Sequence, residues 1–470
     1  IQEVHRALKL GAGEYSWVFG KGGLYLILFF EYGVLYVISW MLGWVENGRD
    51  FAIQALQDRT AIYTIGRVTV AIMGVATCYV VFLIARRIYD ERTALASALI
   101  GALAYFHAVF SGVINVDIGS TLALWSSLLI YLRYEEMGKK RYLVAAGAVA
   151  AVAVAFKFPG GIALPLIFAA LATVPRGSPV GGHLIRDCAI ATIAMLVTLT
   201  AIAPEWIAGI RGLIRYNFMA AVQAANAVAQ DAELWADIKS ITVMRPEWRP
   251  GYLIHLTNEY NIALTATALF GEVIGALRKN RWDLILTSMV VIFIFVMSLS
   301  DRTQPERYLL PIVPALWMLG ARGAMTLGRY RPYLLGVALI LIVAMPIFWL
   351  VRAAVEKSQE DTRVHAKNWI EANVPSGARI LVDGMRYRFS QGPPLNADRT
   401  TVQEKVDRAI EEGGNFGRGV SELALSVYEE AMVSTSGPKY ELVSTVHGLK
   451  VQDVTYYVKN CFDYIVTSSM

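Results

Sequence analysis

The stretch KKRYLVAAGAVAAVAVAFKFPGG, residues 139–161, contains the pattern that decides the fold. Three basic residues precede an apolar run of mostly alanine and valine, and Lys157 follows that run before a Pro-Gly-Gly turn. Such a run is typical of a helix that crosses or nearly crosses a bilayer, whose hydrocarbon core is ~30 Å thick. The dense small residues of Ala145–Ala155 favour close packing of this helix against neighbouring membrane helices.

The same pattern repeats along most of the chain, from Ala61 to Val351. It predicts about ten spanning segments, at residues 61–85, 93–116, 118–133, 143–157, 160–174, 186–208, 258–278, 283–299, 308–327 and 333–351. Lysine and arginine gather in every second connection between them, and the positive-inside rule places these connections in the cytoplasm. The other connections carry isolated charges beside apolar helix ends, namely Asp117, Lys157, Asp301, Arg302, Glu306 and Arg307. We therefore expect a multi-pass membrane protein whose chemistry lies on the outer face.

The overall composition agrees with this interpretation. The chain has 470 residues, of which 56% are hydrophobic and only 17% charged, whereas soluble domains have about a quarter charged residues. Its net charge of +5 includes no basic tract of the kind that nucleic-acid binding needs, so nucleic acid is not expected as a partner. The three cysteines and six histidines form no disulfide framework or metal motif.

Three regions are expected. Residues 1–60 are predicted to be an outer loop with juxtamembrane helices, in which the aromatic-rich segment Leu24–Val45 lies at the membrane interface. Residues 61–351 form the transmembrane helical domain, with a long outer loop from about Ile210 to Tyr260 as a candidate lid or binding element. Residues 352–470 alternate predicted helices and strands, with strands at residues 378–383, 440–446 and 463–468. The expected fold class is thus an α-helical polytopic membrane protein with a small extracytoplasmic α/β domain at its C-terminal end.

Asp117 is the clearest candidate for a functional residue. An ionisable side chain at membrane depth costs about 2.5–3.5 kcal/mol on insertion scales, so it is a functional candidate by default. The alternative is that Asp117 only caps the helix that follows it.

Cations near the predicted outer face suit a phosphate ligand. Lys157 and Lys21 each adjoin glycine-rich turns, although Lys157 could equally be a lysine that extends from a helix end towards the interface. Arg307 and Tyr308 precede an apolar helix, and a guanidinium group matches the geometry of phosphate oxygens. Arg67, one turn inside its helix, could join them or pair with Glu31.

Four segments resemble the GT-C class of membrane glycosyltransferases, in particular the protein O-mannosyltransferase and lipid A aminoarabinose transferase branch. Gly20-Lys21-Gly22-Gly23-Leu24-Tyr25 resembles a Lys-Pro-Pro-Leu element with glycines in place of the prolines, and Ile65-Gly66-Arg67 resembles an arginine at a helix start. The segment from His107 to Asp117 resembles one that ends in Thr-Asp, with Val116 at the threonine position. Arg307-Tyr308-Leu309-Leu310-Pro311 with Pro314 resembles an Arg/Lys-Tyr-x-x-Pro-x-x-Pro element.

The resemblance implies inverting transfer of a sugar from a polyprenyl-phosphate donor to an acceptor hydroxyl on a protein, lipid or glycan. Lys21, Lys157 and Arg307 would then stabilise the leaving phosphate, helped by Tyr308 and Arg67, and Asp117 would orient the acceptor or a metal. The acidic pair that defines this class has no counterpart in residues 1–23, and we expect it upstream of Ile1. The catalytic base is therefore unassigned, and no cofactor is certain, with a divalent cation left open.

The sequence also leaves two other classes of function open. A transporter would place polar residues through the depth of several helices and often show internal repeats, neither of which this sequence has. A catalytically inactive GT-C relative, serving as a structural subunit of a membrane assembly, is the stronger alternative because of the Lys-Gly-Gly departure. The expected location is a bacterial or archaeal plasma membrane rather than the endoplasmic reticulum.

Overall fold

The structure is a computed structural model. It describes residues 23–175, 178–180, 183–203, 251–258, 261–277, 280–298, 306–382, 392–415, 422–444 and 454–467, together with Val4, Ala7, Leu8 and Leu10. Most of the predicted outer loop from Ile210 to Tyr260, and also Lys21, lie outside the described residues. The chain divides into two compact units, and each is described separately.

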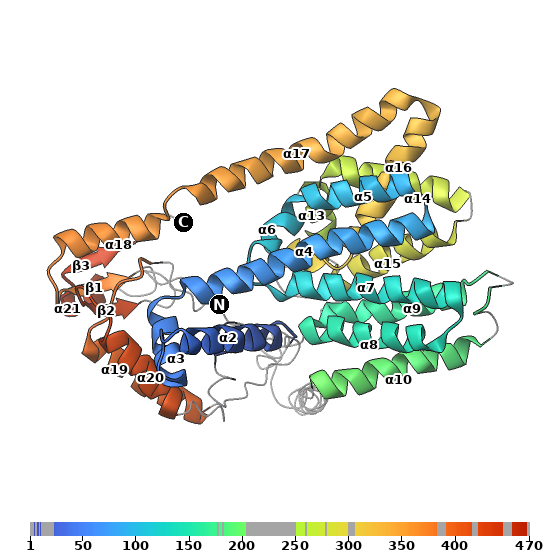
Figure 1. The fold of residues 1–470 in the computed structure, drawn as a ribbon. Coiled ribbons are helices and arrows are strands. Elements are labelled where there is room, and N and C mark those ends of the chain that lie inside the picture. Colours follow the sequence, from blue (N-terminus) through green and yellow to red (C-terminus); the bar gives the residue numbers. More distant parts are fainter. Residues whose placement is uncertain are drawn as a thin grey trace, which may run out of the picture. The chain divides into compact units, whose positions relative to one another are not determined.

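The first unit is a bundle of helices and includes residues 65–352 (Figure 1). Its elements, some of which extend past the unit boundary, are α4 (Thr60–Ile88), α5 (Glu91–Leu103), α6 (Tyr105–Ser111), α7 (Val116–Met137), α8 (Lys140–Phe156), the 3-10 turn η1 (Phe158–Ile162), α9 (Ala163–Ala172), α10 (Leu184–Ile202), α13 (Gly251–Asn258), α14 (Ile262–Leu277), α15 (Arg281–Ser298), the 3-10 turn η2 (Glu306–Leu309), α16 (Val313–Tyr330) and α17 (Pro332–Ser358). Each predicted spanning segment coincides with one of these helices or with a consecutive pair. The helical prediction is therefore confirmed.

The helices are those of a multi-pass membrane protein. Five of the described helical segments are long and apolar enough to cross a membrane: Gly23–Met41, Thr60–Ile88, Leu184–Ile202, Arg281–Ser298 and Pro332–Asn373. The pair α5 and α6, bent by 60° at a short break, would make a sixth. Several other predicted spans are shorter helices, so the count of about ten stays a prediction. The interfacial placement of Leu24–Val45 also stays a prediction, because α2 (Gly23–Met41) is long enough to cross.

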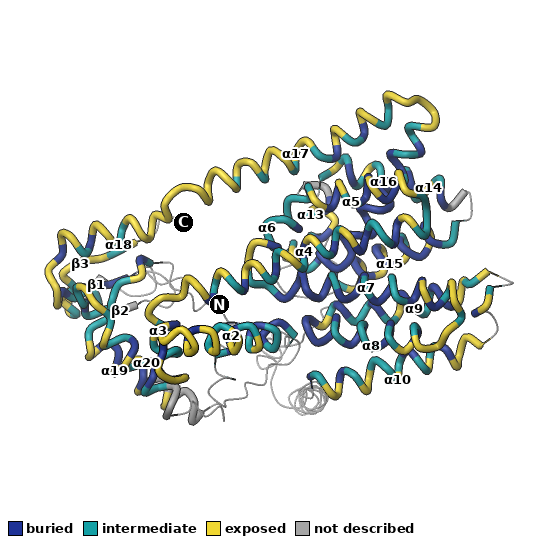
Figure 2. The backbone as a smooth tube through the Cα atoms, viewed as in Figure 1, coloured by how far each residue is buried: buried dark blue, intermediate teal, exposed yellow. Residues whose placement is uncertain are grey.

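Small residues allow the helices of the first unit to pack closely. Helix α8 packs between α7 and α10, and Gly147 of α8 lies directly against the backbone of Ala191 in α10. Helix α16 packs on α14 and α5, and Gly323 of α16 lies against the backbone carbonyl of Thr267 in α14. Figure 2 shows that α7, α8 and α16 are mostly buried, whereas α17 is exposed along much of its length.

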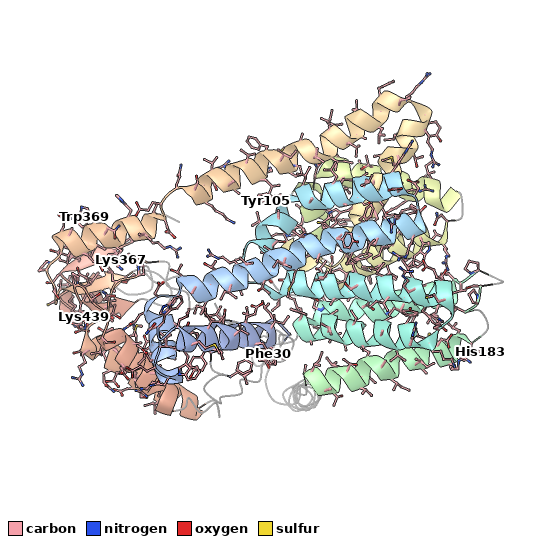
Figure 3. All side chains as sticks on the ribbon, in the orientation of Figure 1. Phe30, Tyr105, His183, Lys367, Trp369 and Lys439 are labelled. Carbon is pink, nitrogen blue, oxygen red and sulfur yellow. The ribbon has the colours of Figure 1, made fainter. Side chains whose placement is uncertain are left out.

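The second unit contains the C-terminal α/β domain. Strands β1 (Arg379–Val382), β2 (Glu441–Ser444) and β3 (Tyr464–Val466) form a parallel sheet in the order β2-β1-β3. Its helices are α18 (Thr362–Asn373), α19 (Arg399–Asn415), α20 (Glu422–Val433) and α21 (Val454–Lys459). Figure 3 labels Trp369 on α18 and Lys439 just before β2. All three predicted strands are confirmed.

The second unit also includes Phe29–Thr64, which the sequence analysis assigned to a separate outer loop. Helix α3 (Gly48–Gln57) packs on α20. Arg49 donates hydrogen bonds to Glu430 at 2.6 Å, and Gln57 donates to Ser434 at 2.9 Å. Polar side chains on α3 therefore attach an N-terminal segment to the C-terminal domain, a long-range contact with no signal in the sequence.

Because α14 packs closely on α16, we predict that added side-chain volume at their contact lowers the stability of the protein. Gly323→Ala should lower stability by about 1–3 kcal/mol, because the added Cβ meets the Thr267 carbonyl, which belongs to the backbone. The matched control is Gly336→Ala in α17, where an added Cβ meets nothing within 4 Å. This control should be neutral or stabilising by up to about 1 kcal/mol. Thermal unfolding of both variants in detergent checks the difference, and equal melting temperatures would contradict it.

Candidate functional site

Asp117 lies in the first turn of α7, at the end of the helix that follows a predicted outer connection. Asn115 is the residue that caps this helix, and its side-chain oxygen accepts a hydrogen bond from the Asp117 amide at 2.8 Å. Asp117 is therefore not the cap, and its carboxylate is available for another role. Because the N-terminus of a helix carries a partial positive charge, a carboxylate is stabilised there.

Lys157 lies at the C-terminal end of α8, the neighbour of α7. Its backbone leaves the helical conformation, and its amide still donates to the Ala153 carbonyl at 3.1 Å. The turn η1 then folds back so closely that Gly160 lies against the Ala153 backbone, where a Cβ would not fit. The ammonium group thus lies at the negative end of the α8 dipole.

Lys157 and Asp117 form a buried ion pair, since the Lys157 ammonium donates to the Asp117 carboxylate. Lys157 is 7% exposed and Asp117 only 2%, so the lysine does not extend to the interface as the alternative had it. The Lys157 ammonium also lies 4.0 Å from the centre of the Tyr308 ring, which is cation–π distance. The fold therefore brings three predicted site residues into one cluster, which we call the Lys157 site.

Arg307 extends this cluster towards the surface. Its side chain is exposed, and its guanidinium carbon lies 5.8 Å from the centre of the Tyr308 ring. Tyr308 is thus flanked by a buried cation and an exposed one. The segment that follows is held in place by Trp125 of α7, whose indole nitrogen donates to the Pro311 carbonyl at 3.0 Å.

The Gly-Lys-Gly-Gly segment ends beside the Lys157 site. Gly23, the first residue of α2, lies against Phe156, and Gly119 of α7 lies against the ring of the same phenylalanine. Phe156 directly precedes Lys157 in the chain. The proposed role of Lys21 stays a prediction, because Lys21 lies outside the described residues.

Arg67 differs from the other predicted cations. It lies in α4 with an exposed side chain, and among the described residues no hydrogen bond, ion pair or ring contact joins it to Asp117, Lys157 or Tyr308, so its proposed role stays a prediction. A divalent cation at Asp117 stays a prediction. Within the described part of the chain, no group of three or more metal-ligating side chains occurs. We derive no step through a metal ion.

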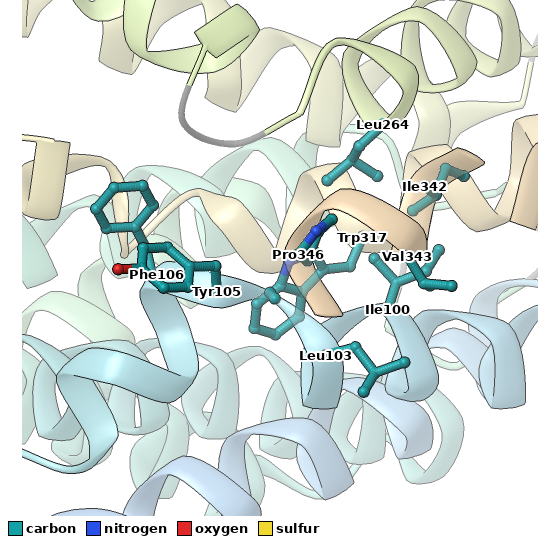
Figure 4. Close-up of a pocket in the computed structure, with 10 residues that line it drawn as sticks. Ile100, Leu103, Tyr105, Phe106, Leu264, Trp317, Ile342, Val343 and Pro346 are labelled. Carbon is teal, nitrogen blue, oxygen red and sulfur yellow. The ribbon is translucent and has the colours of Figure 1, made fainter. Parts of the chain in front are cut away.

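An apolar pocket lies within the same bundle, between α5, α6, α14, α16 and α17 (Figure 4). Ile100, Leu103, Leu264, Trp317 and Pro346 are among the side chains that line it. Most of its wall is hydrocarbon surface.

Sequence reasoning missed two residues that shape the site. Asn115 carries a signal that could have been used, because an asparagine just before an apolar helix is typical of a cap. Trp125 carries no such signal, since its partner Pro311 is far away along the chain and only the packed bundle brings them together.

Comparison with known proteins agrees with these observations. Residues 63–207, which include Asp117 and Lys157, match the family model of dolichyl-phosphate-mannose-protein mannosyltransferase. This match confirms the resemblance to the GT-C class of membrane glycosyltransferases. No curated protein matches the chain in a sequence comparison.

Solved structures of this class are also similar to the chain. The archaeal oligosaccharyltransferase AglB from Archaeoglobus fulgidus, in complex with an inhibitory peptide and a dolichol-phosphate, has 15% identity and a TM-score of 0.47 over 79% of this chain. ArnT from Cupriavidus metallidurans, bound to undecaprenyl phosphate, has 17% identity and a TM-score of 0.47 over 92% of this chain. The matches cover 54% of the AglB chain and 70% of the ArnT chain, so this chain spans about half the length of the archaeal protein.

The buried ion pair predicts a characteristic stability pattern. Asp117→Asn and Lys157→Met should each destabilise the protein by about 3–5 kcal/mol, because each leaves one charged or polar partner buried without its counterpart. The double variant should recover most of this loss, since no unpaired charge remains. Thermal unfolding of the wild type, the two single variants and the double variant in detergent measures these differences as a double-mutant cycle.

The control for this cycle is Arg133→Gln, which breaks an ion pair with Glu136 whose side chains are 51% and 44% exposed. An exposed pair contributes at most about 1 kcal/mol, so this variant should melt close to the wild type. The interpretation fails if the two single variants lose no more stability than the control does.

Proposed function

We propose that the chain transfers a sugar, with inversion, from a polyprenyl-phosphate-linked donor to an acceptor hydroxyl at the Lys157 site. The observation that carries the proposal is the buried cation of Lys157 with Asp117 and Tyr308 around it, at the end of the bundle that carries isolated charges. The family match over residues 63–207 supports the same class of reaction. That this site lies on the outer face of the membrane is part of the proposal.

The reaction exchanges one bond to the sugar for another. The acceptor oxygen bonds to the anomeric carbon, the bond from that carbon to the phosphate oxygen breaks, and the polyprenyl phosphate leaves with the electron pair. A phosphate group that approaches the site meets the exposed guanidinium of Arg307 first and the buried ammonium of Lys157 next. Both cations offset the negative charge that develops on the leaving group.

Asp117 changes its partner in this scheme. Without donor, its carboxylate neutralises Lys157. When a phosphate takes the lysine, the carboxylate is released to accept a hydrogen bond from the acceptor hydroxyl and orient it. The carboxylate that removes the hydroxyl proton stays unassigned. The hydrocarbon chain of the donor is proposed to lie along exposed apolar surfaces of the bundle.

The rival is an inactive relative that serves as a structural subunit. One observation favours it, since Lys157 and Asp117 satisfy each other without any ligand. The double variant Asp117→Asn/Lys157→Met separates the two proposals, because it removes both charges together. If the pair is only structural, the double variant should transfer sugar to the same extent as the wild type. If the pair is catalytic, the double variant should fold but should not transfer sugar.

The assay uses the full chain in proteoliposomes, with radiolabelled polyprenyl-phosphate mannose as the probe donor and release of polyprenyl phosphate as the readout. We expect the wild type to break down the donor and the double variant to lose activity by at least about a hundredfold, as oxyanion-stabilising groups do when removed. Equal release by both proteins would overturn the catalytic role of the pair, and donor breakdown absent from the wild type would favour the structural subunit.

Arg307→Ala gives an independent test through binding. The loss of one charge-assisted contact should weaken binding of undecaprenyl phosphate about tenfold or more, since such contacts contribute about 1.5–3 kcal/mol. Arg331→Ala is the control, because Arg331 is an exposed arginine at the basic end of the bundle. Native mass spectrometry measures both affinities, and similar affinities for the two variants would remove Arg307 from the site.

A further inference from the structure

A groove lies at the opposite end of the bundle from the Lys157 site, where the basic connections gather. It is lined by α5, by the end of α16 and by the start of α17. Arg92 and Arg329 lie at its charged end, and Leu95, Leu99, Leu335 and Leu339 form much of its wall. We call it the Arg92 groove.

The two arginines of this groove differ from other arginines at the same end. Arg87 pairs with Glu136 at 3.1 Å, Arg186 pairs with Asp187 at 3.0 Å, and Arg281 pairs with Glu135. Arg92 and Arg329 are exposed, and no ion pair within the described part of the chain involves either.

Two acids and two arginines line the groove, so its formal charges balance, but one of the acids is turned away from the arginines. Asp90 is committed to capping α5, because its carboxylate accepts hydrogen bonds from the Thr93 amide at 2.8 Å and the Thr93 hydroxyl at 3.0 Å. Glu91 is the remaining acid, and its side chain is exposed beside the two arginines. An anion held between the two guanidinium groups would therefore contact both cations directly, whereas the Asp90 carboxylate stays against Thr93.

The leucines of the groove are arranged so that an acyl chain can lie along them. Leu95 and Leu99 are four residues apart on α5, as are Leu335 and Leu339 on α17, so each pair lies on one face of its helix. Each second leucine lies about 6 Å further along its helix, away from the arginines. Leu95 is 58% exposed and Leu99 48%, which leaves their surface free to contact an acyl chain.

Exposed tyrosines mark the level of the headgroups. Tyr330 is 62% exposed and Tyr333 is 67% exposed, and both adjoin the connection between α16 and α17. Tyrosine rings prefer the interface between headgroups and hydrocarbon. We therefore expect Arg329, next to Tyr330 in the chain, at the depth of the lipid phosphates.

We propose that the Arg92 groove binds one anionic phospholipid of the surrounding leaflet, with its phosphate between Arg92 and Arg329 and an acyl chain along the leucines. Basic pockets between membrane helices on the cytoplasmic side are suited to anionic headgroups in general. This lipid would be a structural partner, distinct from the sugar donor and independent of the proposed transfer.

Native mass spectrometry of the full chain in detergent tests the proposal, with dioleoyl phosphatidylglycerol and dioleoyl phosphatidylcholine as probes. The wild type should bind phosphatidylglycerol at least about fivefold more tightly, and Arg92→Gln or Arg329→Gln should each remove about fivefold of that affinity. Arg141→Gln, an exposed arginine of another basic connection, should leave the affinity unchanged. Equal binding of the two lipids, or an equal loss with Arg141→Gln, would overturn the proposal.

A second pair of variants tests the apolar wall without touching the arginines. Leu99→Trp should fill the groove and lower the affinity for phosphatidylglycerol, whereas Leu196→Trp, at an exposed position of α10, should not. Inorganic phosphate at millimolar concentration should fail to displace the lipid. Displacement by phosphate, or unchanged binding in Leu99→Trp, would show that no acyl site exists there.

Discussion

The buried ion pair between Lys157 and Asp117 is the constraint on which one end of this bundle depends. Each charge would be costly alone at that depth, and each lies at the helix end whose dipole stabilises it. The pair can form only if α7 begins where α8 ends, as two antiparallel neighbours do. The Asn115 cap and the close return of η1 against Ala153 place those two ends together.

The same pair gives the site its chemical character. A lysine held by a carboxylate is neutralised, yet it can exchange that partner for another anion of suitable geometry. Tyr308 contributes an aromatic face that accommodates the cation in either state, and Arg307 supplies a second cation at the surface. A buried ion pair contributes little net stability compared with apolar side chains of the same volume, so its presence in the core of the bundle fits a functional role.

At the opposite end of the bundle, many basic residues lie close together in the connections between helices. Counting basic residues in the connections indicates orientation, but the folded chain neutralises several of them with acids from neighbouring helices. Glu136, Glu135 and Asp187 each pair with an arginine, and Asp187 also accepts a hydrogen bond from Tyr134 at 2.7 Å. Two arginines without such partners, Arg92 and Arg329, line one apolar groove.

The sequence by itself determined the helical segments of the membrane domain, the three strands of the C-terminal domain and the identity of Asp117, Lys157, Arg307 and Tyr308 as candidates. These features follow from hydrophobic periodicity and from the cost of a charge in an apolar segment, both of which are local. Only the tertiary structure decided that Lys157 and Asp117 are partners and that α3 packs on α20. Those outcomes depend on which helix faces meet, and glycines such as Gly147 and Gly160 set the meeting points by allowing backbones to touch. Such contacts join residues far apart in the chain, and no local pattern encodes them.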